Sequence, residues 1–157
     1  MSDTLHFLNM AIELARANIA AGGRPFGAVL VRDGQVLATG VNEILTSHDP
    51  TAHAELMAVR AASRKLGSPD LSGCAVYASG HPCPMCMAAM RLAGIREVAY
   101  AYSNDDGAPY GLSTAAVYAD LAKPFEEQSM RIRHVPVPEQ GGPGLYAQWQ
   151  QAIHRQA

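Results

Sequence analysis

A tight-turn dipeptide followed by a regular alternation of strand-like and helix-like segments constrains this fold more than any other feature. Asp33-Gly34 stands between two strand-like runs, residues 27–32 and 35–41, and this dipeptide is typical of a two-residue β-hairpin. Beyond the hairpin, strand-like runs alternate with helix-like patterns; the strands are 74–79, 96–102 and 131–137, and the helices are 50–66, 83–93, 113–121 and 145–155. The sequence therefore predicts an α/β protein with a mixed five-stranded sheet.

Helices are expected on both faces of this sheet, which gives a three-layer α/β/α sandwich. An opening helix is predicted over residues 3–21, because its apolar side chains repeat at helical spacing. The connection between strands 96–102 and 131–137 is long enough for a helical crossover, so these two strands are expected to be parallel. We expect one domain over residues 1–157.

The composition narrows the range of partners and compartments. Apolar residues make up 48% of the 157 residues and the net charge is -2, which is ordinary for a globular protein but unlike a chain that grips a phosphate backbone. No apolar run approaches the roughly 20 residues of a membrane span, and the first residues do not resemble a signal peptide. Three cysteines do not form a disulfide framework. We therefore expect a cytoplasmic protein without membrane or nucleic-acid partners.

Two short motifs carry the chemistry. His53-Ala54-Glu55 falls in the first turn of the helix predicted over 50–66, with Asp49 as its expected N-cap and Pro50 in its first position. Pro82-Cys83-Pro84-Met85-Cys86 falls at the start of the next predicted helix, where both thiols face one side. Helix N-termini favour thiolates, and helices that follow strands present their N-termini at one sheet edge. His53, Cys83 and Cys86 are therefore predicted to hold Zn²⁺ and to leave its fourth position for water.

Glu55 is the candidate catalytic residue. It lies two residues from His53, which is a poor spacing for a second ligand on one helix but allows the carboxylate to reach the cavity beside the metal. A zinc ion lowers the pKa of bound water to about 7, so a nearby carboxylate can move protons during hydrolysis. The H-x-E and P-C-x-x-C pair is the signature of zinc deaminases that act on nucleobases.

Simpler interpretations of the same residues remain open. A Cys-x-x-Cys pair can be a redox pair or half of a structural zinc site, for which Cys74 is the one spare cysteine. Cys74 opens an apolar strand, where a free cysteine is usually a small core residue. The other histidines are interpreted as surface or core residues; they are His6, His48, His134 and His154.

Over roughly residues 5–150 the chain resembles the cytidine-deaminase-like superfamily, with its closest likeness to bacterial guanine deaminases and related nucleoside deaminases. The residues that carry the resemblance are Pro25 to Val29, Asn42, Asp49 to Glu55, Pro82 to Cys86, Val117-Tyr118, Lys123-Pro124 and Glu126-Glu127. The resemblance implies a zinc-dependent hydrolytic deaminase with the sandwich fold and a homodimer, in which a partner's C-terminal segment closes the active site. It also implies substrate-binding roles, carried over to Asn42, Phe26, Ala54, Thr114 and His81.

The chain departs from the family at several positions that bear on substrate. Guanine deaminases carry an acidic residue near the position of Thr114, and the family usually has a glutamate where this chain has His81. A hydroxyl cannot replace an acceptor-only carboxylate that faces two N–H donors. The sequence therefore predicts a substrate other than guanine, unless Asp105 or Asp106 supplies the missing carboxylate.

Three functions compete at this point. The first is a deaminase for a free purine, pterin-like or pyrimidine base. The second is a tRNA adenosine deaminase, which should carry a basic surface that is weak in this chain. The third is a zinc-stabilised binding module without catalysis, against which Glu55 argues because a purely structural metal site has no use for a carboxylate at that position.

Overall fold

The computed structural model describes residues 3–138 and 141–155. The chain divides into two compact units, Met1–Ala122 and Lys123–Ala157. Residues 1–2, 139–140 and 156–157 lie outside the described part. A single domain over residues 1–157 stays a prediction.

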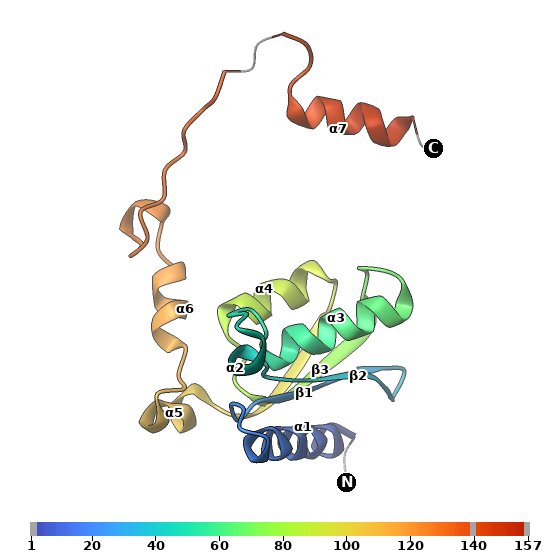
Figure 1. The fold of residues 1–157 in the computed structure, drawn as a ribbon, viewed down its shortest axis with the longest axis vertical. Coiled ribbons are helices and arrows are strands. Elements are labelled where there is room, and N and C mark those ends of the chain that lie inside the picture. Colours follow the sequence, from blue (N-terminus) through green and yellow to red (C-terminus); the bar gives the residue numbers. More distant parts are fainter. Residues whose placement is uncertain (1–2, 139–140, 156–157) are drawn as a thin grey trace. The chain divides into compact units, whose positions relative to one another are not determined.

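The first unit holds a mixed four-stranded sheet in the order β2-β1-β3-β4 (Figure 1). Its strands are β1 (Gly27–Arg32), β2 (Gln35–Val41), β3 (Cys74–Gly80) and β4 (Glu97–Tyr102). Its helices are α1 (Asp3–Ala20), α2 (Ile44–Ser47), α3 (Ala54–Leu66), α4 (Pro84–Leu92), α5 (Asn104–Gly107), the 3-10 turn η1 (Ala108–Tyr110) and α6 (Ala115–Leu121). Strand β1 is antiparallel to β2 and β3, whereas β3 and β4 are parallel.

Helices cover both faces of the sheet, as the sequence predicts. Helix α1 packs against β1 and β3 on one face, and α3 packs against β2 and β1 on the other, beside α4 (Figure 1). Alternate residues of β1 divide between the two layers: Leu30 packs in the core under α3 and α4, and Val29 packs in the core under α1. Because both faces are covered, β1 is apolar almost throughout rather than alternating with polar residues.

The predicted hairpin is confirmed, and a glycine near its far end brings α3 close to the sheet. Asp33 and Gly34 both have positive φ angles, 51° and 73°, as a tight two-residue turn between twisted strands requires.

On β2, a Cβ added to Gly40 would lie 2.2 Å from the backbone oxygen of Ala54. The missing side chain therefore allows the first turn of α3 to lie directly on β2.

The predicted start of α3 was wrong by several residues. The helix begins at Ala54, with His53 as N-cap, and not at Pro50. The Asp49 carboxylate accepts hydrogen bonds from the backbone and hydroxyl of Thr51, at 2.8 and 2.7 Å, and closes a turn ahead of the helix. The Arg60 guanidinium donates to the Thr51 hydroxyl at 2.9 Å and holds this turn against α3. Asp49 therefore orders the segment that leads into His53 instead of capping the helix.

The second unit contains η2 (Phe125–Glu127) and α7 (Leu145–His154). The fifth strand, predicted over 131–137, is wrong: this segment has no regular secondary structure, and the sheet of the described residues has four strands. Pro136 and Pro138 lack the N–H groups that a ladder needs, and Val135 and Val137 are exposed. The expected parallel pairing of this segment with the preceding strand is wrong for the same reason.

No helix in the described ranges combines the length and the apolar character that crossing a membrane requires.

Candidate active site

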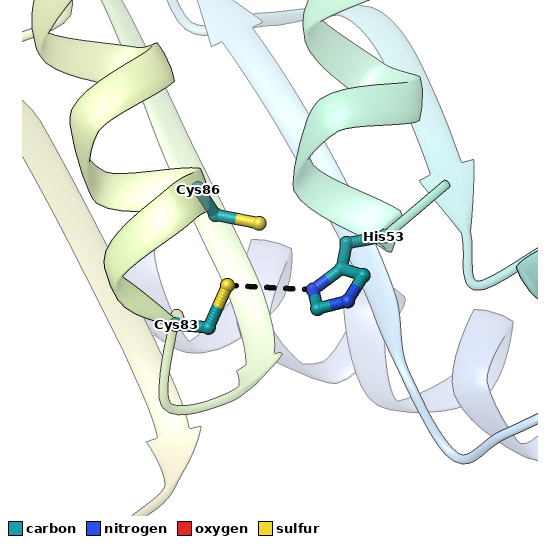
Figure 2. A group of neighbouring side chains, drawn as sticks. All are labelled: His53, Cys83 and Cys86. Carbon is teal, nitrogen blue, oxygen red and sulfur yellow. Dashed lines mark hydrogen bonds between the residues drawn. The ribbon is translucent and has the colours of Figure 1, made fainter. Parts of the chain in front are cut away.

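Two helix starts bring the three candidate ligands together. His53 and Cys83 are the N-caps of α3 and α4, and both have extended backbone angles, so their side chains project from the ends of the helices. Pro84 occupies the first turn of α4, where its lack of an N–H costs nothing. Cys86 lies in the first turn of α4 and is fully buried. Figure 2 shows the imidazole of His53 facing the two sulfur atoms.

The spacing and chemistry of these side chains fit a zinc ion. One ligand atom from each of His53, Cys83 and Cys86 lies within 4.8 Å of the other two, and Cys83 Sγ is 3.4 Å from His53 Nδ1 (Figure 2). A tetrahedron with zinc-to-ligand bonds of about 2.0–2.3 Å has edges of about 3.3–3.8 Å. Two thiols and an imidazole are the donors that zinc prefers, and three protein ligands leave one position open.

The electrostatics of the group favour metal binding. A hydrogen bond from the Cys86 thiol, reinforced by His53, lowers the pKa of Cys83 to about 4. The hydrogen bond with Cys83 raises the pKa of His53. The hydrogen bond with Cys83 and burial raise the pKa of the Cys86 thiol, and repulsion by the negative charges of Glu55 and Cys83 adds to the shift. A divalent cation removes that repulsion, so this cluster of titratable groups is suited to hold one.

Glu55 is a buried carboxyl group next to the thiols. Its side chain is 7% exposed, and Cys86 Sγ lies 3.4 Å from its Oε2 atom. Burial raises the pKa of Glu55, which brings the carboxyl group closer to the range where it can both accept and return a proton. Cys74, in contrast, is not part of the group and packs in the apolar core. A structural site with Cys74 as fourth ligand is therefore not formed.

His53, Cys83 and Cys86 are together called the metal group. A cavity of about 140 Å³ lies between this group and the predicted substrate residues. All five of these residues line it; they are Phe26, Asn42, Ala54, Thr114 and His81. His53, Glu55 and Cys83 also line it. The structure thus brings the predicted residues together in one place, although they come from five separate segments of the chain.

Asp105 and Asp106 do not line this cavity. The Asp106 carboxylate accepts hydrogen bonds from the backbone and hydroxyl of Ser103, at 2.8 and 2.9 Å, and caps the start of α5. These bonds lower the pKa of Asp106. Among the residues that line the cavity, Glu55 carries the one carboxylate, so neither aspartate supplies the acidic group that the sequence lacks at Thr114.

The amide of Asn42 is held in one orientation. Asn42 is 4% exposed, and its Oδ1 atom accepts a hydrogen bond from the backbone N–H of Ile44 at 3.2 Å. Because Oδ1 of Asn42 is engaged by Ile44, the Nδ2 atom is the part of the amide that can form a hydrogen bond with a ligand. Asn42 therefore presents a hydrogen-bond donor to the cavity.

Some residues that shape the cavity were missed by the sequence analysis. Arg24 and the segment 111–113 line it. Asn18, on α1, donates from Nδ2 to the backbone oxygens of Arg24 and Asn42, at 2.8 and 2.9 Å. A polar residue near the end of an amphipathic helix carries no sequence signal of such a role, because its partners are backbone atoms of distant segments.

Comparison with known proteins agrees with this site. Residues 1–102 match the family described as the cytidine and deoxycytidylate deaminase zinc-binding region. Guanine deaminase of Bacillus subtilis is 42% identical over 138 residues, which cover 87% of this chain and 88% of that protein. A crystal structure of guanine deaminase from the same species has a TM-score of 0.83 at 39% identity and covers 96% of this chain and 92% of its own.

The fold and the site together define a zinc-dependent hydrolytic deaminase. The chain belongs to the cytidine and deoxycytidylate deaminase family. A tRNA-specific adenosine deaminase of Agrobacterium fabrum is also similar, with 38% identity over 107 residues, 68% of this chain and 70% of that protein. The expectation that nucleic acid is not a partner is therefore not supported by the comparisons, since such relatives act on tRNA.

Proposed function

We propose that this chain removes the exocyclic amine of a small free base, with release of ammonia. The observation that carries the proposal is the shared cavity, in which Glu55, the metal group and the Asn42 donor meet. Its volume of about 140 Å³ is below the roughly 300 Å³ at which pockets for drug-sized ligands begin. A single ring system suits this volume better than a larger molecule.

Each residue has a distinct part in this reaction. His53, Cys83 and Cys86 would hold zinc, which when bound makes a water molecule nucleophilic at neutral pH. Glu55 takes one proton from that water and delivers it to the ring nitrogen, and then moves the remaining hydroxyl proton to the leaving amine, so base and water give the oxo base and ammonia. Phe26 and Ala54 line the walls against the ring, and the Asn42 amide donates to a ring acceptor.

The substrate is proposed to be a base other than guanine, because the described residues that line the Thr114 side of the cavity include no carboxylate. Guanine presents an N–H and an amino group along one edge, and a carboxylate accepts from both. Thr114 and Ser113 offer hydroxyl groups there. A site whose polar groups do not match a substrate can discriminate strongly against it.

A substrate panel tests this proposal. Ammonia release from guanine, isocytosine, cytosine, adenine, pterin, guanosine and tRNA should be compared by kcat/KM. We expect a free base to rank first and guanine not to lead by a wide margin. A wide lead for guanine contradicts the reading of Thr114, and a lead for tRNA contradicts the free-base proposal in favour of the function of the tRNA-specific relatives.

We also propose a homodimer, which the resemblance to bacterial guanine deaminases implies. The second unit offers apolar side chains on α7 that its own residues do not cover; among them are Leu145, Tyr146 and Trp149. Aromatic residues of this kind are enriched at interfaces. Light scattering at micromolar concentration should give twice the chain mass, and a monomer mass would contradict the proposal.

A further inference from the structure

We propose that Asn104 is a positioning residue that sets the hydrogen-bond polarity of His81 and Thr114 in the active-site cavity. The proposal deepens the proposed function by naming the polarity of the substrate edge. Asn104 is the first residue of α5 and lines a larger neighbouring cavity of about 480 Å³. Thr114 lines the active-site cavity, and His81 lines both. The Asn104 amide therefore contacts two residues that line the active-site cavity, His81 and Thr114, without lining that cavity itself.

The orientation of the Asn104 amide is fixed by a backbone donor. Its Oδ1 atom lies 3.1 Å from the backbone nitrogen of Thr114, which can only donate. The same oxygen lies 3.4 Å from the Thr114 hydroxyl. The other end of the amide, Nδ2, lies 3.3 Å from Nδ1 of His81. The nitrogen of a primary amide is a donor and cannot accept.

The orientation of this amide selects the tautomer of His81. Because Asn104 Nδ2 donates, Nδ1 of His81 is the acceptor and its proton is on Nε2. The Pro82 oxygen is 3.1 Å from the same Nδ1 and also accepts from the Tyr118 hydroxyl; because a carbonyl oxygen has two lone pairs, this oxygen and the Asn104 donor compete for Nδ1. The competition favours Asn104, because its Oδ1 is fixed by the Thr114 N–H and a proton on Nδ1 would face the donor Nδ2 of the amide.

Two aromatic neighbours hold the His81 ring in place. Tyr100 and Tyr118 meet it edge to face, with ring centroids 4.6 and 5.4 Å away. With Nδ1 engaged and the ring packed, Nε2–H is the group that His81 can offer to a ligand. His81 is therefore a donor in the cavity.

Thr114 receives the opposite polarity. Its hydroxyl proton points to Asn104 Oδ1, so its lone pairs are left for a ligand. The cavity then offers donors from Asn42 and His81 and an acceptor from Thr114. A base that fits this pattern presents ring or carbonyl acceptors on two sides and one N–H on the third.

The direct test is the tautomer of His81 in the zinc-loaded protein without substrate. Long-range ¹H–¹⁵N NMR of the imidazole should show the Nε2–H form in the wild type. Asn104→Asp keeps the acceptor for Thr114 but replaces the donor by an oxygen, so His81 should change to the Nδ1–H form. Ala108→Asp, which adds the same charge on the exposed turn η1, should leave the tautomer unchanged. An Nδ1–H form in the wild type overturns the proposal.

Kinetics supply a second test on the best base of the panel. Asn104→Asp should lower kcat/KM by about tenfold, which corresponds to one hydrogen bond, and the change should be in KM because these groups bind the ring and do not react. The effect should disappear when His81 is replaced by Phe, since coupled residues do not act additively. Equal effects in both backgrounds contradict action through His81. The NMR result stands whether or not a free base proves to be the substrate, so the two proposals fail separately.

Discussion

The metal group and the rim of the cavity are built in different ways. The rim segment, residues 104–114, consists of the short α5 and η1 and the turn after them; all of its residues are half-buried or exposed, and 111–114 line the cavity. The metal group instead lies at the starts of α3 and α4. These two helices pack with β1 and β3 in one buried apolar core. The groups proposed to react are thus fixed by packing, whereas the groups proposed to contact the substrate depend on a few hydrogen bonds. Substitutions in the two regions should therefore differ in kind.

The largest effect should follow loss of a ligand in the metal group. Cys86→Ser should remove zinc and leave no measurable turnover, because even the loss of a partner that only orients a ligand costs about 10–100-fold. A chelator should have the same effect on the wild type. Cys74→Ser is the matched control: it changes a buried cysteine outside the group and should keep about one zinc per chain. Metal analysis and ammonia release measure both, and a fully metallated Cys86→Ser protein would disprove the ligand set.

Glu55→Gln should lower kcat by about 10²–10⁴-fold while zinc content and fold are kept. Glutamine has the same shape but cannot carry a proton between water and the amine. Glu97→Gln, on the exposed start of β4, should have wild-type activity. Turnover of Glu55→Gln within about tenfold of the wild type would contradict the assigned role, since acid–base catalysis normally contributes more.

A substitution on the rim should change the order of substrates without stopping the chemistry. Thr114→Asp should raise kcat/KM for guanine relative to the other bases by about tenfold, because a hydrogen bond to a charged group is stronger than a neutral one by about 1.4 kcal/mol. Thr114→Asn has nearly the same shape without the charge and should not produce the change. If both variants leave the order of the panel unchanged, Thr114 does not contact the substrate edge.

The smallest effect should be on stability, and its sign depends on pH. Burial raises the pKa of Glu55 in the folded protein. Its protonated form therefore stabilises the fold below the ordinary pKa of about 4.3, and this contribution is lost as the pH rises through the raised pKa. Metal-free Glu55→Gln should then have a higher urea midpoint than the metal-free wild type at pH 7. The two midpoints should converge below about pH 4, and a constant difference across this range would contradict the pKa shift.

The contrast between the two regions also explains what could be predicted from the sequence. The metal group was predictable because local spacing fixes its geometry once helices form there: Glu55 is two positions after His53, and Cys86 is three positions after Cys83. The layered sheet followed from hydrophobic periodicity, and its coverage by helices is confirmed.

The failures come from interactions that a pattern does not encode. Asp49 has the sequence appearance of an N-cap, but its carboxylate is used by Thr51, so α3 begins later. The apolar alternation around Val135 resembles a strand, but the prolines beside it remove ladder donors. Asn104 gave no signal, because its role depends on His81 and Thr114, which are near it only in the folded chain.

Gly40 has a consequence for any attempt to evolve this enzyme toward a new substrate. Any side chain at this position would collide with the backbone at Ala54, the residue between His53 and Glu55. A library that randomises the β2 surface would therefore lose most of its members at position 40 through misplacement of the reacting groups. Diversity is better concentrated on rim positions such as Ser113 and Thr114, which line the cavity but are not among the residues proposed to bind zinc or move protons.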